Sequence, residues 1–304
     1  MAAVVVYYVR QNTLIGDTTT RVVERHGGHP ARLSLAKLAR AARGGVITVE
    51  RAAEALSVSR RTAALKASGF ARRGWLLRLR RGTYLVLPLE VEPGRPTTVE
   101  DPWVLASVVF APCYIGGWSA AEHWGLTEQI FRSTLVVTAA HVRRQSASVA
   151  GQEFRLFRIP RARLAGSVTV WRAAERVAVS DRERTIVDSL RRPELMGVVR
   201  HLTDVMREYA HHPEHNFGKL TAVARDFASG AGWKRLGYLA EQLWPEQDAL
   251  IAEARSRVTA GYVRLDPAVK ARGPLVRRWG IQVNVVVHRH VQPAKDLRLH
   301  VRRD

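Results

Sequence analysis

Two helical patterns separated by only three residues constrain the fold of this chain more than any other feature of its sequence. Apolar residues at helical spacing predict one helix over 49–56 and another over 60–73. Thr48 and Ser59 each stand directly before one of these patterns, where an N-cap side chain is favoured. The break at 57–59 lets the later helix stand clear of the earlier one, which is the arrangement of a helix-turn-helix.

The elements on either side complete a winged helix-turn-helix. A further helical pattern over 33–43 precedes the pair. Two runs rich in β-forming residues, 75–79 and 83–87, follow it and flank a tight turn at Gly82, which predicts a hairpin. Helix, helix, turn, helix and hairpin is the order of a winged helix-turn-helix, so residues 32–92 are predicted to form such a domain.

The third helix of this domain is predicted to bury one face and expose the other. Ala63, Ala67 and Phe70 fall on the face toward the core, and Gly74 stands where a C′ glycine closes a helix. Leu65 falls on the outer side, and a glycine inside the helix, Gly69, costs about 1 kcal/mol relative to alanine. These last two residues fit the pattern imperfectly.

Positive charge is concentrated in the predicted domain. The 304 residues carry a formal net charge of +21, from 48 Lys and Arg against 27 Asp and Glu. Residues 32–92 contain 13 basic and 4 acidic side chains. Such a surface attracts polyanions, of which nucleic acid is the first candidate and an anionic membrane or an acidic protein the second. A genome rich in G and C would also raise the arginine content, but it would not concentrate the basic residues in the third helix and the hairpin.

We therefore predict that the third helix and the hairpin bind double-stranded DNA. The first residues of such a helix reach base edges in the major groove, where arginine pairs with guanine or holds a phosphate. The hairpin tip is placed to follow the backbone or the minor groove. The predicted contacts are Ser59, Arg60, Arg61, Thr62, Lys66, Arg72, Arg73, Arg78, Arg80 and Arg81. The alternative is a winged helix that contacts only protein.

The rest of the chain is predicted to be a larger mixed α/β domain, which makes the protein α+β in class. Proline punctuates a linker at 93–98, the second domain covers 99–304, and residues 1–31 are an extension without a place in either domain. Helices are expected at 101–110, 119–124, 180–190, 195–210, 218–228, 233–243 and 246–255, and strands at 135–138, 154–159, 168–171, 178–179 and 279–287.

No catalytic residue, metal site or cofactor is predicted. Asp181, Glu183 and Asp188 could suggest a metal-dependent nuclease, but Ser180 and Glu183 have the form of a capping box, and Asp188 lies four residues after Arg184. The single cysteine excludes a disulfide within the chain and a zinc site built on cysteines. No apolar run approaches the length of a membrane span, and the opening nine residues make a poor signal peptide. A cytoplasmic location is expected.

Four segments occur in an order that one known family shares. They are 62–84, which contains the predicted hairpin, then 114–121 with His123 and Gly125-Leu126, then 180–190 with Arg192-Pro193, and finally 235–239. Each resembles the AbiEi-type antitoxins of type IV abortive-infection toxin–antitoxin systems, and the resemblance covers about 32 to 285. Each segment is weakly specific alone, but the ordered set is more so. The first thirty residues have no counterpart in the family pattern.

The resemblance implies a function that the residues alone do not give. Such antitoxins bind inverted repeats upstream of their own operon and repress it through the winged helix. Their second domain counters a toxin that resembles nucleotidyltransferases, usually without a stable complex. Two alternatives stay open: a nuclease or nucleic-acid-modifying enzyme, favoured by acids clustered around a lysine in one pocket, and a ligand-responsive regulator, favoured by a closed apolar pocket.

Overall fold

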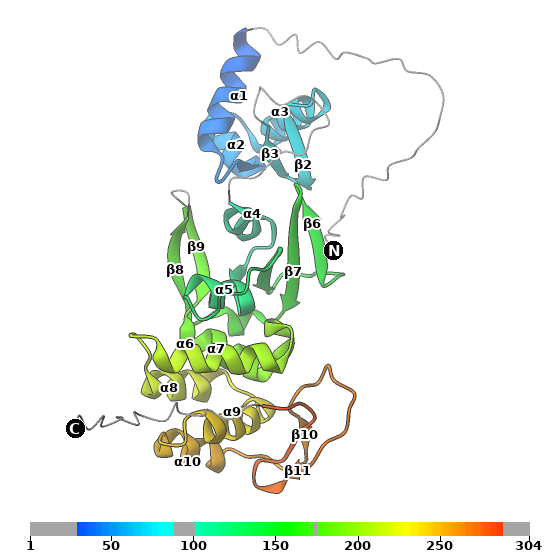
Figure 1. The fold of residues 1–304 in the computed structure, drawn as a ribbon. Helices are drawn as coiled ribbons and strands as arrows, with labels where there is room; N and C mark the ends of the chain where they lie inside the picture. The colour runs from blue at the N-terminus through cyan, green and yellow to red at the C-terminus, as the bar shows by residue number, and fades with distance from the viewer. Residues whose placement is uncertain (1–28, 88–100, 173–174, 288–304) are drawn as a thin grey trace, which may run out of the picture. The chain divides into compact units, whose positions relative to one another are not determined.

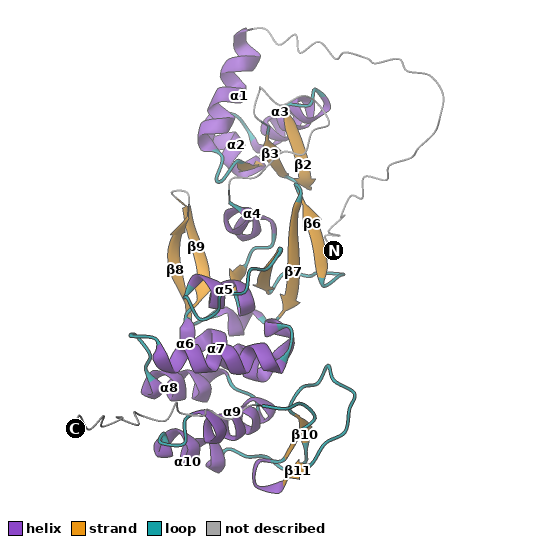
Figure 2. Ribbon diagram, viewed as in Figure 1, coloured by secondary structure: helices purple, strands orange, loops and turns teal. Residues whose placement is uncertain are grey.

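The computed structural model describes residues 29–87, 101–172 and 175–287 (Figure 1). The predicted linker at 93–98 and almost all of the predicted extension at 1–31 lie outside these residues. The described chain mixes helices with three β-sheets, so the predicted α+β class is confirmed (Figure 2).

The predicted winged helix-turn-helix is present. Its elements are α1 (His29–Ala41), β1 (Val46–Thr48), α2 (Val49–Leu56), α3 (Arg60–Arg72), β2 (Leu76–Arg80) and β3 (Thr83–Val86). The three strands form one antiparallel sheet in the order β1-β3-β2, so the strand before α2 pairs with the outgoing strand of the hairpin.

Side-chain caps set the two helix starts, as the sequence predicts. The Thr48 hydroxyl accepts a hydrogen bond from the Arg51 amide at the start of α2. The Ser59 hydroxyl accepts one from the Thr62 amide at 3.2 Å at the start of α3. Between them Ser57 adopts a left-handed conformation with φ of 52°, which ends α2 and turns the chain toward α3.

A six-stranded mixed sheet follows the winged helix. Its strands run in the order β6-β7-β5-β4-β9-β8. They are β4 (Cys113–Ile115), β5 (Ser133–Thr138), β6 (Ser146–Val149), β7 (Gln152–Arg158), β8 (Ser167–Arg172) and β9 (Glu175–Ser180), accompanied by α4 (Pro102–Val109), α5 (Gly117–His123) and the 3-10 turn η1 (Arg161–Leu164). The sequence did not predict β4, which has only three residues, or β6, an edge strand of small and polar side chains.

Helices dominate the region after the sheet. They are α6 (Arg182–Arg191), η2 (Pro193–Met196), α7 (Val199–His211), α8 (Phe217–Phe227), α9 (Gly230–Leu243) and α10 (Asp248–Ser256). A small sheet follows, made of β10 (Val263–Arg264), β11 (Leu275–Val276) and β12 (Ile281–Gln282), with η3 (Arg277–Trp279) before β12.

Two predictions in this region are wrong in detail. The strand expected over 279–287 is reduced to β12, because Trp279 ends a 3-10 turn and Gly280 adopts a left-handed φ of 58°. The capping box expected from Ser180 and Glu183 is not formed, because Asp181 is the N-cap of α6 and accepts the hydrogen bond of the Arg184 amide at 2.7 Å. The Ser180 hydroxyl instead donates to the carbonyl of Ile115.

The chain divides into two compact units. Of the described residues, the first comprises 29–87, 101–119, 130–172 and 175–180, and the second comprises 120–129 and 181–287. The winged helix and the six-stranded sheet both fall in the first unit, and the predicted boundary at 93–98 lies outside the described residues. Within the described ranges, no helix has both the length and the apolar character that crossing a lipid bilayer requires.

Candidate nucleic-acid interface

Helix α3 packs one face into the core of the winged helix and exposes the other. Ala63, Ala67 and Phe70 are buried, as predicted, and the Phe70 ring lies 5.5 Å from the buried ring of Trp75. At the C-terminal end Gly74 has a φ of 74°, and its amide bonds to the carbonyl of Ala71, which closes the helix. The opposite face of α3 therefore points toward solvent.

Four basic side chains of the predicted site lie on this exposed helix. Arg60, Arg61, Lys66 and Arg72 are all exposed. One of them is paired: a guanidinium nitrogen of Arg60 lies 2.5 Å from a carboxylate oxygen of Glu50, with both side chains largely in solvent. An ion pair this exposed contributes at most about 1 kcal/mol, so a phosphate can compete for Arg60.

The two hydroxyl residues of the predicted site are partly committed to the helix start. Ser59 caps α3, and its hydroxyl oxygen lies 2.9 Å from that of Thr62. Both residues remain exposed. Positioning the first turn of α3 is thus the role that the geometry assigns to Ser59.

Arg73 is held in place at the other end of α3. Its guanidinium carbon lies 5.1 Å from the Phe70 ring centre and 4.8 Å from that of Trp75, and its Nε donates to the carbonyl of Gly69 at 3.2 Å. Cation–π contacts and a cation at a helix C-terminus are both favourable. The result is a fixed positive charge on an exposed residue.

The three arginines of the wing do not behave alike. Arg78 and Arg81 are exposed. Arg80 points inward, where its Nε donates to the Thr83 hydroxyl at 3.2 Å and a terminal nitrogen donates to the carbonyl of Val108 at 3.0 Å. Burial lowers the pKa of Arg80. We therefore leave Arg80 out of the proposed contact set.

A β-bulge accounts for this difference. Arg78 pairs with Tyr84 and Arg80 pairs with Thr83, so the register between β2 and β3 shifts between the two arginines. In a regular strand residues 78 and 80 would point to the same face. The bulge breaks that alternation and redirects Arg80, and no residue in the sequence marks its position.

The acidic residues that suggested a nuclease form ion pairs in the second unit. The Lys219 ammonium lies 2.9 Å from Asp181 and 2.7 Å from the buried carboxylate of Glu183, which also accepts a hydrogen bond from the Tyr209 hydroxyl. Burial alone would lower the pKa of Lys219, but its hydrogen bonds to the two carboxylates raise that pKa overall. Sequence spacing did not reveal Lys219, because it lies 36 residues beyond Glu183.

Asp188, the third acid, forms a separate pair. Its carboxylate lies 2.9 Å from the Nε of Arg184 one turn earlier on α6, and both side chains are buried, as the four-residue spacing predicts. Across the described ranges, no three or more His, Cys, Asp or Glu side chains gather in a way that could hold a metal ion.

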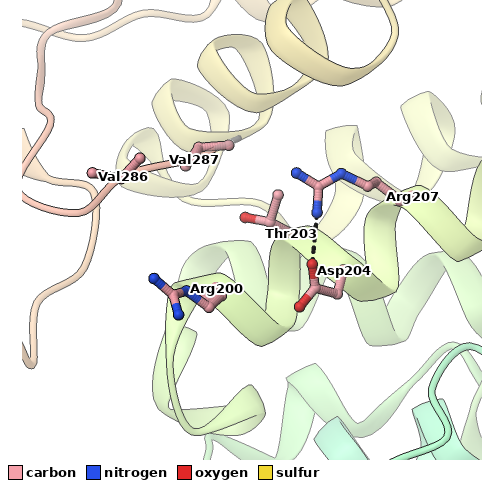
Figure 3. A pocket seen from close by; sticks show the side chains of 6 residues that line it. All are labelled: Arg200, Thr203, Asp204, Arg207, Val286 and Val287. Atoms are coloured by element: carbon pink, nitrogen blue, oxygen red, sulfur yellow. Dashed lines mark hydrogen bonds and ion pairs between the residues drawn. The ribbon is translucent and has the colours of Figure 1, made fainter. Parts of the chain in front are cut away.

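A small pocket opens beside α7 in the second unit. It is lined by four residues of α7 and by Val286-Val287; the four are Arg200, Thr203, Asp204 and Arg207 (Figure 3). The Arg207 guanidinium donates a hydrogen bond to the Asp204 carboxylate. The volume of the pocket is about 120 Å³, below the roughly 300–1,000 Å³ of typical small-molecule sites.

One solved structure has a fold similar to that of this chain. The crystal structure of the RV2827C protein from Mycobacterium tuberculosis resembles this chain with a TM-score of 0.52 and 18% sequence identity, over 83% of this chain and 90% of that one. At this identity the likeness concerns the fold. No curated protein matches the chain in sequence.

One family model matches the chain at the winged helix itself. It is described as "Transcriptional regulator, AbiEi antitoxin" and matches residues 35–86. That span runs from the middle of α1 to the end of β3 and so includes α3 and the wing. The winged helix at residues 35–86 is therefore similar to that of the AbiEi antitoxin transcriptional regulators.

Proposed function

We propose that this protein binds the DNA upstream of its own operon and represses it, and that it also counters a nucleotidyltransferase-like toxin. The proposal places the protein in the cytoplasm and assigns it no catalytic step. The observation that carries it is the set of exposed basic side chains on α3, namely Arg60, Arg61, Lys66 and Arg72, in a winged helix similar to that of the AbiEi regulators.

The charge distribution around α3 supports DNA as the ligand. The acidic residues of the described winged helix, Glu50 and Glu54, both lie on α2, and α3 itself has none. A winged helix that binds only protein would need such a charge distribution for an acidic partner alone. DNA is favoured, because each phosphate that a basic side chain neutralises releases counterions.

Repression is tested with a reporter gene placed behind the chain's own upstream region. Expression of the full chain is expected to lower reporter output. The double variant Arg61→Ala and Arg72→Ala is expected to restore it, because both residues are exposed and their loss leaves the fold intact. Equal repression by this variant and the wild type would refute the role of α3.

The antitoxin role is tested by growth of cells that express the neighbouring toxin. The full chain, expressed from an unrelated promoter, is expected to restore growth. The Arg61→Ala, Arg72→Ala variant is expected to restore it equally, because the proposed antagonism does not depend on operator binding. Failure of the wild-type chain to protect against any nucleotidyltransferase-like protein encoded beside it would contradict this part of the proposal.

One observation favours the enzyme alternative. Asp181 and Glu183 gather around Lys219, the combination of charges that a nuclease site needs. We favour a structural role, because Asp181 caps α6 and Glu183 is buried against Tyr209. The two explanations differ in the outcome of Asp181→Asn: loss of all protection from the toxin in a folded variant would favour an enzyme, and retained protection would favour the structural role.

The ligand-responsive alternative has less support. The pocket beside α7 has a volume of about 120 Å³ and is lined in part by the charged side chains of Arg200 and Arg207. A site for a small apolar molecule is typically enclosed, mostly apolar and roughly 300–1,000 Å³ in volume.

A further inference from the structure

The centre of the exposed face of α3 is uncharged. Helical residues advance by about 100° each, so Leu65 lies about 140–160° around the helix from buried Ala63, Ala67 and Phe70. It therefore points almost directly away from the core. Its side chain is 67% exposed, although the same helix also exposes the basic residues Arg61, Lys66 and Arg72.

Gly69 lies one turn further along the same face. It is within about 40° of Leu65 on the helical projection, and Arg61 and Arg72 lie at similar or smaller angles. A Cβ added at Gly69 would meet only the guanidinium nitrogens of Arg73 at 3.8 Å and of Arg72 at 4.0 Å, which is ordinary contact. Packing within the protein thus gives no reason for glycine here, although glycine weakens a helix relative to alanine.

We infer that Leu65 and Gly69 form an apolar stripe that enters the major groove, in which Leu65 contacts the C5-methyl group of a thymine. The inference rests on the proposed DNA binding. The thymine methyl is the apolar group that the major groove offers, and it distinguishes thymine from the other bases. Gly69 allows the α3 backbone to approach the bases more closely than a side chain would, and the surrounding arginines remain free to reach phosphates.

The size of the effect follows from the hydrophobic contribution of one methyl group. Burying a CH₂-sized group is worth about 0.8 kcal/mol, and 1.36 kcal/mol corresponds to tenfold in an equilibrium constant. One methyl contact therefore changes affinity about fourfold.

Uracil substitution isolates this contact, because uracil differs from thymine only by the methyl group. The probe is the fragment upstream of the chain's own coding sequence, prepared once with thymine and once with uracil, and binding is measured by fluorescence anisotropy. We expect the wild-type chain to bind the thymine fragment about fourfold or more tightly than the uracil fragment. We expect Leu65→Ala to bind both fragments equally and Leu65→Met to retain the preference.

Leu77→Ala is the matched control. Leu77 is also an exposed leucine of the winged helix, 42% exposed, but it lies on β2 rather than α3. This variant is expected to keep the wild-type preference for thymine. The inference is overturned if the wild type binds both fragments equally, or if Leu65→Ala keeps the full preference.

Gly69→Ala separates the DNA role of the glycine from a structural one. The variant is expected to melt about 1–4 °C higher than the wild type, since alanine favours the helix, and yet to bind the promoter fragment at least fivefold more weakly. Unchanged affinity would overturn the role given to Gly69. If the wild type shows no preference for its own upstream fragment over a shuffled one, the proposed function fails as well, which is a distinct result from equal binding of the thymine and uracil fragments.

Discussion

Arg80 and Arg81 are neighbours in sequence, but the structure gives them opposite roles, and their substitution by glutamine tests this directly. Arg80 donates one hydrogen bond to the buried hydroxyl residue Thr83 and one to the carbonyl of Val108. Hydrogen bonds of a charged group contribute about 1.5–3 kcal/mol each when fully buried. Because Arg80 is only half-buried, we expect Arg80→Gln to lower the free energy of unfolding by about 1–3 kcal/mol in total.

The same substitution at Arg81 is expected to affect DNA binding instead. Arg81 is exposed, so Arg81→Gln is expected to change the free energy of unfolding by less than about 0.5 kcal/mol. If Arg81 neutralises one phosphate, its loss makes the slope of log affinity against log salt less steep by about 0.9. Arg80→Gln is expected to leave that slope unchanged.

Two measurements on the full chain decide the matter: urea unfolding, and promoter binding from 50 to 300 mM salt. An Arg80→Gln variant with wild-type stability and a reduced salt slope would refute the reasoning. It would show that Arg80 leaves its internal partners and binds DNA, as its position in a regular strand suggests.

Three further outcomes are expected. Ser59→Ala removes the N-cap of α3 and should lower the free energy of unfolding, measured by urea titration, by about 0.5–2 kcal/mol. Ser59→Asp should keep the wild-type stability, because its carboxylate can still accept a hydrogen bond from the Thr62 amide. Asp181→Asn and Lys219→Met should each weaken the ion pair between these two side chains without abolishing protection from the toxin in the growth assay. An enzyme would be supported if the variants lost all protection at an unchanged melting temperature and if the wild type cleaved nucleic acid only with Mg²⁺. Burial raises the pKa of Cys113 to about 12, and the thiolate is the form that reacts with iodoacetamide. At pH 8 alkylation of Cys113 should therefore be roughly a thousandfold slower in the native chain than in the unfolded chain. Comparable rates would contradict the burial of its thiol.

Local signals allowed the winged helix to be predicted from sequence nearly residue by residue. Hydroxyl caps at Thr48 and Ser59 and the glycine after α3 act within a few residues, so their effects can be seen in the sequence. The inward turn of Arg80 could not be predicted, because it depends on a bulge and on a carbonyl 28 residues away.

In the second unit the limits of sequence reasoning are similar. The start of α6 was placed almost correctly, but Asp181 rather than Ser180 caps it, because Ser180 still belongs to β9. Glu183 carries no sign in sequence that it is buried against Tyr209, a contact made across 26 residues.

The measurement that tests the central claim most directly is the salt dependence of binding to the chain's own promoter DNA. With Arg80 excluded, five or six of the seven exposed basic side chains at α3 and the wing are expected to neutralise phosphates, which predicts a slope of log affinity against log salt of about −5. Affinity for the promoter should also exceed that for a shuffled fragment at every salt concentration. A slope near zero, or equal affinity for both fragments, would contradict the claim that this protein is a DNA-binding regulator.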